Sequence, residues 1–123
     1  MNDRKGGVLI VEDEALVAFD LAELVRASGW DVIGPALSIP KARQMIDGHR
    51  PEVALLDIDV RGEKIWELAG DLRASGCTLI FVSAEPKLDG KASDFPGSAF
   101  LPKPASVPQI KTALIDAFRA RRD

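Results

Sequence analysis

Short apolar runs alternate with segments of helical spacing along the whole chain, and this alternation restricts the fold more than any other feature. The apolar runs predict strands at residues 8–11, 30–33, 53–57, 78–82 and 99–101. Large apolar residues recur three or four positions apart in the segments 14–28, 41–47, 64–75 and 106–121. Strands that alternate with helices in this way form a parallel sheet with helices packed against it. The sequence therefore predicts an α/β domain.

The apolar runs also differ in a way that predicts their places in the sheet. The runs VLIV, VALL and TLIFV lack polar alternation, as expected for strands that are covered on both faces. We expect these three at the centre, and the shorter or alternating runs at 30–33 and 99–101 at the edges. The stretch 85–98 carries two prolines and two glycines, so any helix there should be short or irregular.

Length and composition restrict the class of protein. A chain of 123 residues with 46% apolar and 28% charged residues is expected to form one domain, residues 1–123. The formal charge of −3 gives no electrostatic footprint for nucleic acid, and no apolar run approaches the roughly 20 residues that span a bilayer. The single Cys77 cannot form an internal disulfide, which favours a reducing compartment. We therefore expect a cytoplasmic protein that binds neither nucleic acid nor membrane.

Polar residues follow four of the predicted strands. They are Glu12 and Asp13 after the first strand, Asp57 and Asp59 at the third, Ser83 and Glu85 after the fourth, and Lys103 after the fifth. In an open parallel sheet the carboxyl ends of the strands meet at one edge, where ligands bind. The sequence therefore predicts that these side chains lie near one another.

Their chemistry indicates a phosphoryl-transfer site. Several carboxylates at one edge repel one another unless a divalent cation is bound among them, and magnesium prefers such oxygen ligands together with phosphate oxygens. Lys103 and Ser83 can donate hydrogen bonds to phosphoryl oxygens. Because a carboxylate can also act as a nucleophile, Asp57 on a central strand is the predicted phosphoryl acceptor.

In their order and spacing, these residues resemble the receiver domain of bacterial two-component response regulators. The matching motifs are Glu12-Asp13 after VLIV, Asp57 after VALL, Ser83 after LIFV, and Lys103-Pro104. The resemblance spans nearly the whole chain. It implies a flavodoxin-like, doubly wound, five-stranded parallel sheet of strand order 2-1-3-4-5 with five helices, of which the fourth is short or irregular.

The resemblance also implies how a cation is held. Asp13 and Asp57 would bind magnesium, or manganese in its place, directly, and Glu12 would act through water. Asp59 would offer its backbone carbonyl to the metal, so that its side chain remains free to line the site.

Other residues take roles around the phosphoryl group by the same resemblance. Ser83 and Lys103 would contact its oxygens, and Phe100 matches the switch aromatic that turns inward when the hydroxyl moves toward it. Asp59 and Glu85 match two variable positions that border the phosphoryl group. We therefore expect these two acids to influence how quickly the acyl phosphate hydrolyses.

The implied partner is a sensor histidine kinase or a histidine phosphotransfer protein, whose phosphohistidine supplies the phosphoryl group. We expect a stand-alone receiver that signals to a downstream protein by altered surface shape or by onward phosphotransfer. Nine of the eleven residues from 15 to 25 are apolar, a wider stripe than one buried helix face requires. Our hypothesis is that Leu16 or Phe19 docks a helix of the partner.

Two departures from the family's pattern and two alternative functions remain. The sequence VRGEK stands after the acceptor, where the family often has a Pro-Gly turn. In the family, the face formed by the fourth helix, the fifth strand and the fifth helix is a frequent signalling surface. Because the fourth crossover is irregular here, the sequence does not decide whether this chain signals through that face. The Asp57-x-Asp59 pair also resembles the nucleophile motif of haloacid dehalogenase phosphohydrolases. In those enzymes, however, the acidic pair follows the nucleophile in the sequence, whereas Glu12 and Asp13 precede it here. The other alternative is a receiver-like binding module that is not phosphorylated.

Overall fold

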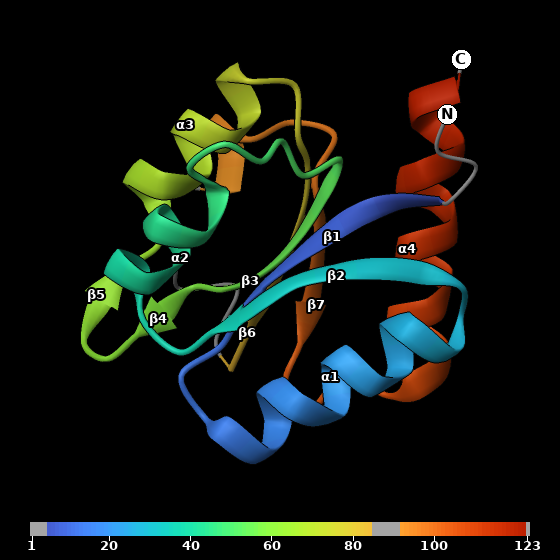
Figure 1. The fold of residues 1–123 in the computed structure, drawn as a ribbon, viewed down its shortest axis with the longest axis horizontal. Helices are drawn as coiled ribbons and strands as arrows, with labels where there is room; N and C mark the ends of the chain where they lie inside the picture. The colour runs from blue at the N-terminus through green and yellow to red at the C-terminus, as the bar shows by residue number, and fades with distance from the viewer. Residues whose placement is uncertain (1–4, 85–91, 123) are drawn as a thin grey trace.

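The computed structural model describes residues 5–84 and 92–122 (Figure 1). Its main sheet has five strands: β1 (Lys5–Val11), β2 (Trp30–Ala36), β3 (Val53–Asp57), β6 (Thr78–Ser83) and β7 (Ala99–Pro102). They lie in the order β2-β1-β3-β6-β7, and every neighbouring pair is parallel. The predicted α/β class and strand order are confirmed, as are the three central strands and the two edge strands.

Four α-helices are present among the described residues: α1 (Ala15–Ala27), α2 (Ile39–Ile46), α3 (Trp66–Ala74) and α4 (Val107–Arg122). α1 and α4 cover one face of the sheet, and α2 and α3 cover the other (Figure 1). The arrangement is the predicted doubly wound one. In this part of the chain, no helix combines the length and the apolar character that crossing a bilayer requires.

Two of the helix starts follow local signals in the sequence. The Ser38 hydroxyl accepts a hydrogen bond from the Lys41 N–H at 3.2 Å at the start of α2. At the start of α4, the Gln109 N–H donates to the Ser106 hydroxyl at 3.2 Å, and the Ser106 N–H donates to Gln109 Oε1 at 2.8 Å. This reciprocal pair satisfies two backbone donors, so Ser106 caps the start of α4.

The segment between β6 and β7 is irregular where it is described. The structure has a 3₁₀ helix, Ala92–Asp94, before β7, and residues 85–91 of this crossover lie outside the described residues. A short or irregular helix was predicted for this crossover from its prolines and glycines. The described part agrees with that prediction.

A two-stranded hairpin after β3 was not predicted. It consists of β4 (Asp59–Val60) and β5 (Glu63–Lys64), paired antiparallel. The two residues of its turn, Arg61 and Gly62, have φ angles of 53° and 82°. Positive φ at both turn positions matches the twist of two-residue hairpins.

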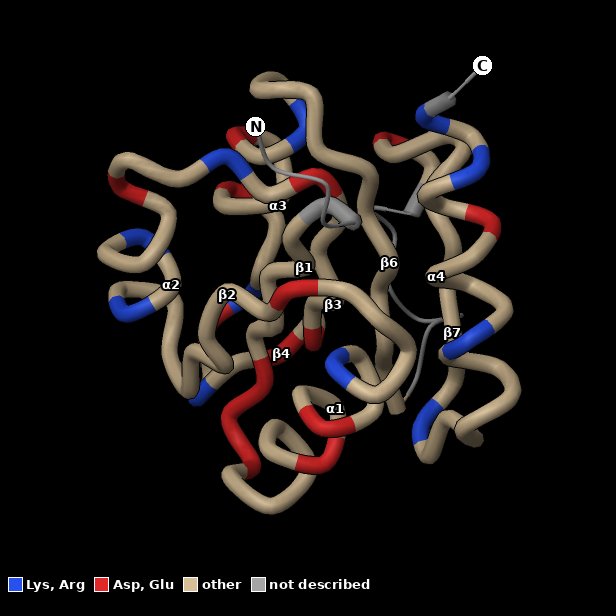
Figure 2. The backbone as a smooth tube through the Cα atoms, turned by 45° about the vertical axis from the view of Figure 1, so that its right-hand side comes forward, with Lys and Arg blue, Asp and Glu red and all other residues tan. Residues whose placement is uncertain are grey.

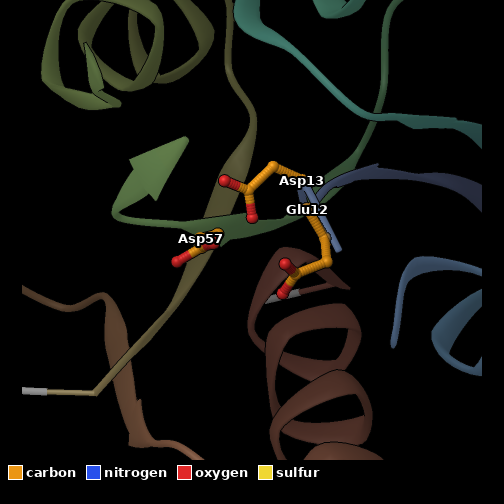
Figure 3. A group of neighbouring side chains, drawn as sticks. All are labelled: Glu12, Asp13 and Asp57. Carbon is orange, nitrogen blue, oxygen red and sulfur yellow. The ribbon is translucent and has the colours of Figure 1, made fainter. Parts of the chain in front are cut away.

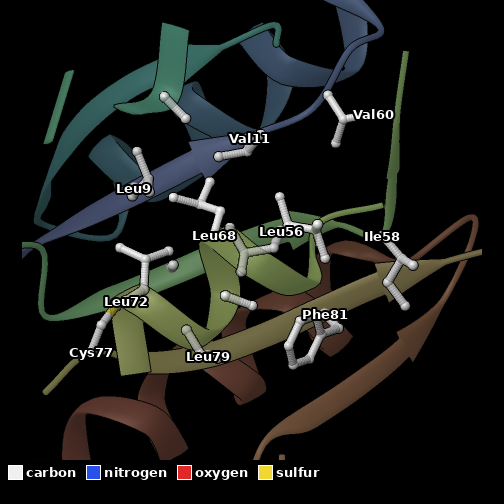
Figure 4. Close-up of a cluster of buried hydrophobic side chains, with 14 of the residues drawn as sticks. Leu9, Val11, Leu56, Ile58, Val60, Leu68, Leu72, Cys77, Leu79 and Phe81 are labelled. Atoms are coloured by element: carbon white, nitrogen blue, oxygen red, sulfur yellow. The ribbon is translucent and has the colours of Figure 1, made fainter. Parts of the chain in front are cut away.

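The core consists of two apolar clusters, one on each face of the sheet. Along β1, Leu9 and Val11 face the cluster under α2 and α3 (Figure 4), whereas Val8 and Ile10 face the cluster under α1 and α4. Successive side chains of a strand point to opposite faces, so a strand covered on both faces needs apolar residues at every position. This geometry explains the unbroken run VLIV.

Aromatic rings gather around Phe81 in the cluster under α3. The Phe81 ring centroid lies 4.8 Å from that of Phe100 in a stacked arrangement, 5.4 Å from that of Trp66 and 5.3 Å from that of Phe95. Pairs at such separations are favourable beyond the area that they bury. These contacts join β6 to β7 and α3.

Candidate functional site

Three carboxylates meet at the carboxyl edge of the sheet (Figure 3). Glu12 and Asp13 directly follow β1, and Asp57 is the last residue of the adjacent strand β3. One oxygen from each residue lies within 4.8 Å of the others. Figure 2 shows the acidic positions after β1 and around β4 at the same end of the molecule. The predicted convergence of these residues is therefore present in the structure.

Lys103 joins this group from the loop between β7 and α4. Its Nζ lies 2.9 Å from Glu12 Oε1 and 3.2 Å from Asp57 Oδ2. The Lys103 N–H donates to the Ser83 carbonyl at 2.9 Å, which ties the loop to the end of β6. Three ionised carboxylates and one ammonium leave two net negative charges, which is the charge that one divalent cation balances.

Hydrogen bonds hold the acidic side chains in place. Glu12, which is 2% exposed, accepts a hydrogen bond on Oε2 from the Glu14 N–H at 3.0 Å. Asp13 accepts one on Oδ2 from the Arg61 N–H at 2.8 Å. Backbone donors therefore orient both residues that follow β1, and each carboxylate keeps an oxygen outside these bonds.

The surroundings of Asp57 favour its protonated form. Burial, followed by repulsion from Glu12, raises the Asp57 pKa from 3.8 to about 6, although the Lys103 ammonium opposes this shift. Burial by itself would lower the Lys103 pKa, but its hydrogen bond to Glu12 and the charge of Asp57 outweigh that effect and raise it. The lysine is therefore a stable cation, and the aspartate is the group whose charge is unfavourable without a further cation.

Replacing Asp57 with asparagine is expected to stabilise the metal-free domain at about pH 7.5. Because the folded-state pKa lies above 3.8, the folded state loses stability as the pH rises from about 4 through about 6, when Asp57 ionises. Removal of the charge should raise the free energy of unfolding by on the order of 1–2 kcal/mol. The gain is smaller than the pKa shift alone implies, because Lys103 loses one of its two charged partners.

Urea unfolding in EDTA at about pH 7.5 and about pH 4 measures this effect. The gain from Asp57→Asn should be present at the higher pH and nearly absent at the lower one, where the wild-type carboxyl already carries a proton. A loss of stability at the higher pH would contradict the prediction.

Ser83 and Phe100 lie close to this group in the sheet. Ser83 is buried at the end of β6, one residue beyond Val82, which is paired with Asp57 in the strand register. Phe100 is half-buried on the neighbouring strand β7 and stacks on Phe81. Ser83 therefore lies on β6, the strand next to the acceptor strand β3, and Phe100 lies on β7, the strand beyond it.

The two remaining predicted residues have different positions. The Asp59 side chain is exposed, and its Oδ1 lies 2.7 Å from Lys64 Nζ across the β4–β5 hairpin. The Asp59 carboxylate is therefore paired within the hairpin. It is not one of the three converging carboxylates, which are those of Glu12, Asp13 and Asp57. Glu85 lies outside the described residues.

The contact of Arg61 with Asp13 was missed by the sequence analysis. The two residues are 48 positions apart, and the contact uses a backbone N–H, which every residue except proline carries. The only local signal was Gly62, which suits a turn with positive φ.

The chain is similar to known proteins both in sequence and in structure. No family model matches the chain. The chain is 32% identical over 120 residues to the transcriptional regulatory protein MalR of Bacillus subtilis, covering 94% of this chain and 51% of that protein. It is 28% identical over 110 residues to the transcriptional regulatory protein PdtaR of Mycobacterium tuberculosis, covering 87% of this chain and 54% of that protein. The chain thus spans about half the length of these curated relatives.

A solved structure matches over nearly the whole chain. The receiver domain of the PhyR response regulator of Erythrobacter litoralis superposes with a TM-score of 0.84 at 27% identity, covering 94% of this chain and 92% of that domain. A match of this quality over 94% of the chain shows that the two share the same fold. The chain therefore belongs to the receiver-domain family of response regulators, a family of signalling proteins.

Proposed function

We propose that this domain accepts a phosphoryl group on Asp57 from the phosphohistidine of a sensor histidine kinase or a histidine phosphotransfer protein. The observation that carries the proposal is the position of Asp57, which is 7% exposed at the end of a central strand. Its carboxylate lies 3.2 Å from the Lys103 ammonium and beside the pair Glu12 and Asp13. A nucleophile, a cationic donor and an acidic group for a cation are the parts that phosphoryl transfer to a carboxylate needs.

In the proposed reaction, an Asp57 carboxylate oxygen forms a bond to phosphorus while the P–N bond of the phosphohistidine breaks. The electron pair of that bond stays with the imidazole nitrogen, which then takes up a proton. The proposed donors to the phosphoryl oxygens are the Lys103 ammonium and the Ser83 hydroxyl. Water later cleaves the acyl phosphate to inorganic phosphate and the free Asp57 carboxylate, so the domain assists transfer to, and hydrolysis from, its own side chain.

Glu12, Asp13 and Asp57 have the chemistry to hold magnesium, or manganese in its place. They offer oxygen ligands only, within 4.8 Å of one another, and Asp57 is buried at a cost that a cation would offset. When bound, the ion supplies charge neutralisation for the phosphoryl oxygens. With the ion in place, the proposed role of Asp13 is to bind it directly and that of Glu12 is to act through water.

The proposed signal begins at Lys103, whose ammonium bridges Glu12 and Asp57 in this structure. A phosphoryl group on Asp57 would offer new oxygens to this lysine and to Ser83. Movement of the Ser83 hydroxyl would then favour an inward position of Phe100, which stacks on Phe81 here. The changed surface, or onward phosphotransfer, would carry the signal to a downstream protein.

The proposed docking surface for the phosphohistidine helix is α1. Leu16 and Phe19 on α1 are 81% and 55% exposed, and their spacing of three residues brings the two side chains to one side of the helix as a small apolar patch. A groove of about 520 Å³ between α1 and the start of α4 includes Glu12 and Lys103 among its lining residues. A helix on this surface would therefore stand beside the acceptor.

We further propose that residues 1–123 act as one receiver domain in the cytoplasm, without direct nucleic-acid binding.

The haloacid dehalogenase-like alternative is less favoured. It requires the second carboxylate of the Asp57-x-Asp59 pair to exchange a proton with the leaving group. In this structure the Asp59 carboxylate is exposed and paired with Lys64. The matched relatives are moreover named as regulators.

Phosphorylation by a small phosphodonor tests the proposal. The purified protein is incubated with acetyl phosphate or phosphoramidate and magnesium, and the product is measured by intact mass and by borohydride reduction followed by peptide mapping. We expect one phosphoryl group per chain, located on Asp57 and absent in EDTA. No incorporation from these donors or from a panel of phosphorylated histidine kinases would instead support a binding module. Turnover of a phosphomonoester would support the phosphohydrolase.

A further inference from the structure

We propose that Arg61 is a positioning residue for the cation site, which holds Asp13 in the orientation that binds the ion. The inference rests on the proposed magnesium-dependent function and extends it to a residue outside the acidic group. Arg61 lies in the turn of the β4–β5 hairpin, 48 residues after Asp13.

Two hydrogen bonds from Arg61 join three segments of the chain. Its backbone N–H donates to Asp13 Oδ2 at 2.8 Å, and its side-chain Nε–H donates to the Leu37 carbonyl at 2.9 Å. The first bond reaches the loop after β1, and the second reaches the connection between β2 and α2. The guanidinium therefore anchors the turn from which the backbone N–H reaches Asp13.

The backbone of Arg61 supports a positioning role. Its φ of 53° makes it the only non-glycine residue with positive φ in the described ranges 5–84 and 92–122. For a residue with a Cβ, this conformation costs on the order of 1–2 kcal/mol and persists only where surrounding contacts hold it. Here the hairpin is closed by the Asp59–Lys64 ion pair and by the hydrogen bond from the Ile65 N–H to the Ile58 carbonyl at 2.9 Å.

The consequence for Asp13 follows from its two carboxylate oxygens. Because Oδ2 accepts the Arg61 N–H, the rotation of the carboxylate is restricted, and Oδ1 lies outside this bond. A metal ligand that is held in its binding orientation loses less conformational entropy when the ion binds. Loss of the side-chain anchor at Leu37 should therefore weaken cation binding even though the N–H itself remains.

The sign of this effect separates positioning from simple electrostatics. Arg61 is a cation near a cation site, so removal of its charge alone should strengthen magnesium binding. Positioning predicts the opposite result. The test uses Arg61→Asn, because asparagine tolerates left-handed φ and keeps the N–H but is too short to replace the arginine side chain.

Two further variants complete the comparison. Arg61→Lys keeps a long side chain with a cationic donor for the Leu37 carbonyl, and therefore serves as the conservative rescue. Arg73→Asn is the matched control, since Arg73 Nη1 also donates to a backbone carbonyl, that of Asp94, at 2.9 Å. The Arg73 guanidinium also lies over the Phe95 ring, 5.9 Å from its centroid.

The dissociation constant for magnesium is measured by calorimetric titration of each variant of the 123-residue chain, and the metal-free stability is measured by urea unfolding in EDTA. We expect Arg61→Asn to weaken binding by about 3- to 10-fold, less than the roughly 10- to 100-fold effects of removing a direct partner of a metal ligand, because the N–H that contacts Asp13 remains. Arg61→Lys should recover most of the affinity, and Arg73→Asn should leave it unchanged. The urea measurement in EDTA shows that each variant is folded before the affinities are compared.

Binding by Arg61→Asn that equals or exceeds wild-type binding would overturn the inference. If that variant does not fold, the backbone amide resonance of Arg61 provides the test. This resonance should shift when magnesium is added to the wild-type protein, and it should also shift in the Asp13→Asn variant. Absence of the shift in either experiment would overturn the inference. Failure of the wild-type protein to bind magnesium would instead overturn the proposed cation site itself.

Discussion

Replacement of Asp57 with asparagine is expected to reduce phosphoryl incorporation from acetyl phosphate by more than about 100-fold, because the amide oxygen is a far weaker nucleophile than a carboxylate. The same replacement at Asp59 should leave incorporation within about 3-fold of wild type, since rim groups that only modulate a reaction have small effects. The two residues are chemically identical and two positions apart. They differ in that Asp57 is buried beside Lys103, whereas Asp59 is exposed and paired with Lys64.

This pair of variants also separates the proposed function from the phosphohydrolase alternative. In a phosphohydrolase of the haloacid dehalogenase type, both carboxylates act in the reaction, so both substitutions should abolish it. In a receiver, Asp59 should alter mainly the lifetime of the acyl phosphate. Intact mass measured over time after removal of the donor gives both the extent of phosphoryl incorporation and the lifetime of the acyl phosphate. Incorporation by Asp57→Asn at the wild-type level would contradict the assignment of the acceptor.

Replacement of Phe81 with alanine is expected to lower the free energy of unfolding by about 3–5 kcal/mol, the usual cost of deleting a large ring from a packed core. Phe81 is fully buried and contacts the rings of Trp66, Phe95 and Phe100. The loss is a large share of the 5–15 kcal/mol that stabilises a typical domain. Urea unfolding followed by Trp fluorescence and by circular dichroism measures it.

Phe19 on α1 provides the matched control for Phe81. Its side chain is 55% exposed, so Phe19→Ala should change the free energy of unfolding by no more than about 0.5 kcal/mol. Equal effects of the two substitutions would contradict the packing described here. Phe19→Ala also leaves the acidic group intact, so a loss of phosphotransfer from a kinase without a loss of acetyl-phosphate reactivity would support docking on α1.

The sequence was most informative where burial is complete. β3 has the predicted bounds, and β1 and β6 contain the predicted runs, because strands covered on both faces are unbroken apolar segments. The edge strand β2 was predicted to end at residue 33 but continues to Ala36, past Gly34 and Pro35. The extension is stabilised by the hydrogen bond from the Glu12 N–H to the Ala36 carbonyl at 3.0 Å, a contact between distant segments.

The acidic group could be predicted because topology alone brings it together. Once VLIV and VALL are adjacent parallel strands, the residues that follow them must meet at one edge, whatever the details of packing. The sequence therefore determined the fold class, the central strands and the convergence of Glu12, Asp13 and Asp57 with Lys103.

Only the tertiary structure decided which carboxylates share Lys103, how Asp13 is oriented and where Asp59 points. The last two features depend on the β4–β5 hairpin, whose turn is held by contacts of Arg61 with Asp13 and Leu37 and in which Asp59 pairs with Lys64. Such contacts join backbone groups and side chains that are 24 and 48 residues apart and leave no periodic pattern in the sequence. Apolar periodicity records burial, which is local to each segment, whereas the direction of a polar side chain depends on partners that arrive only when the chain has folded.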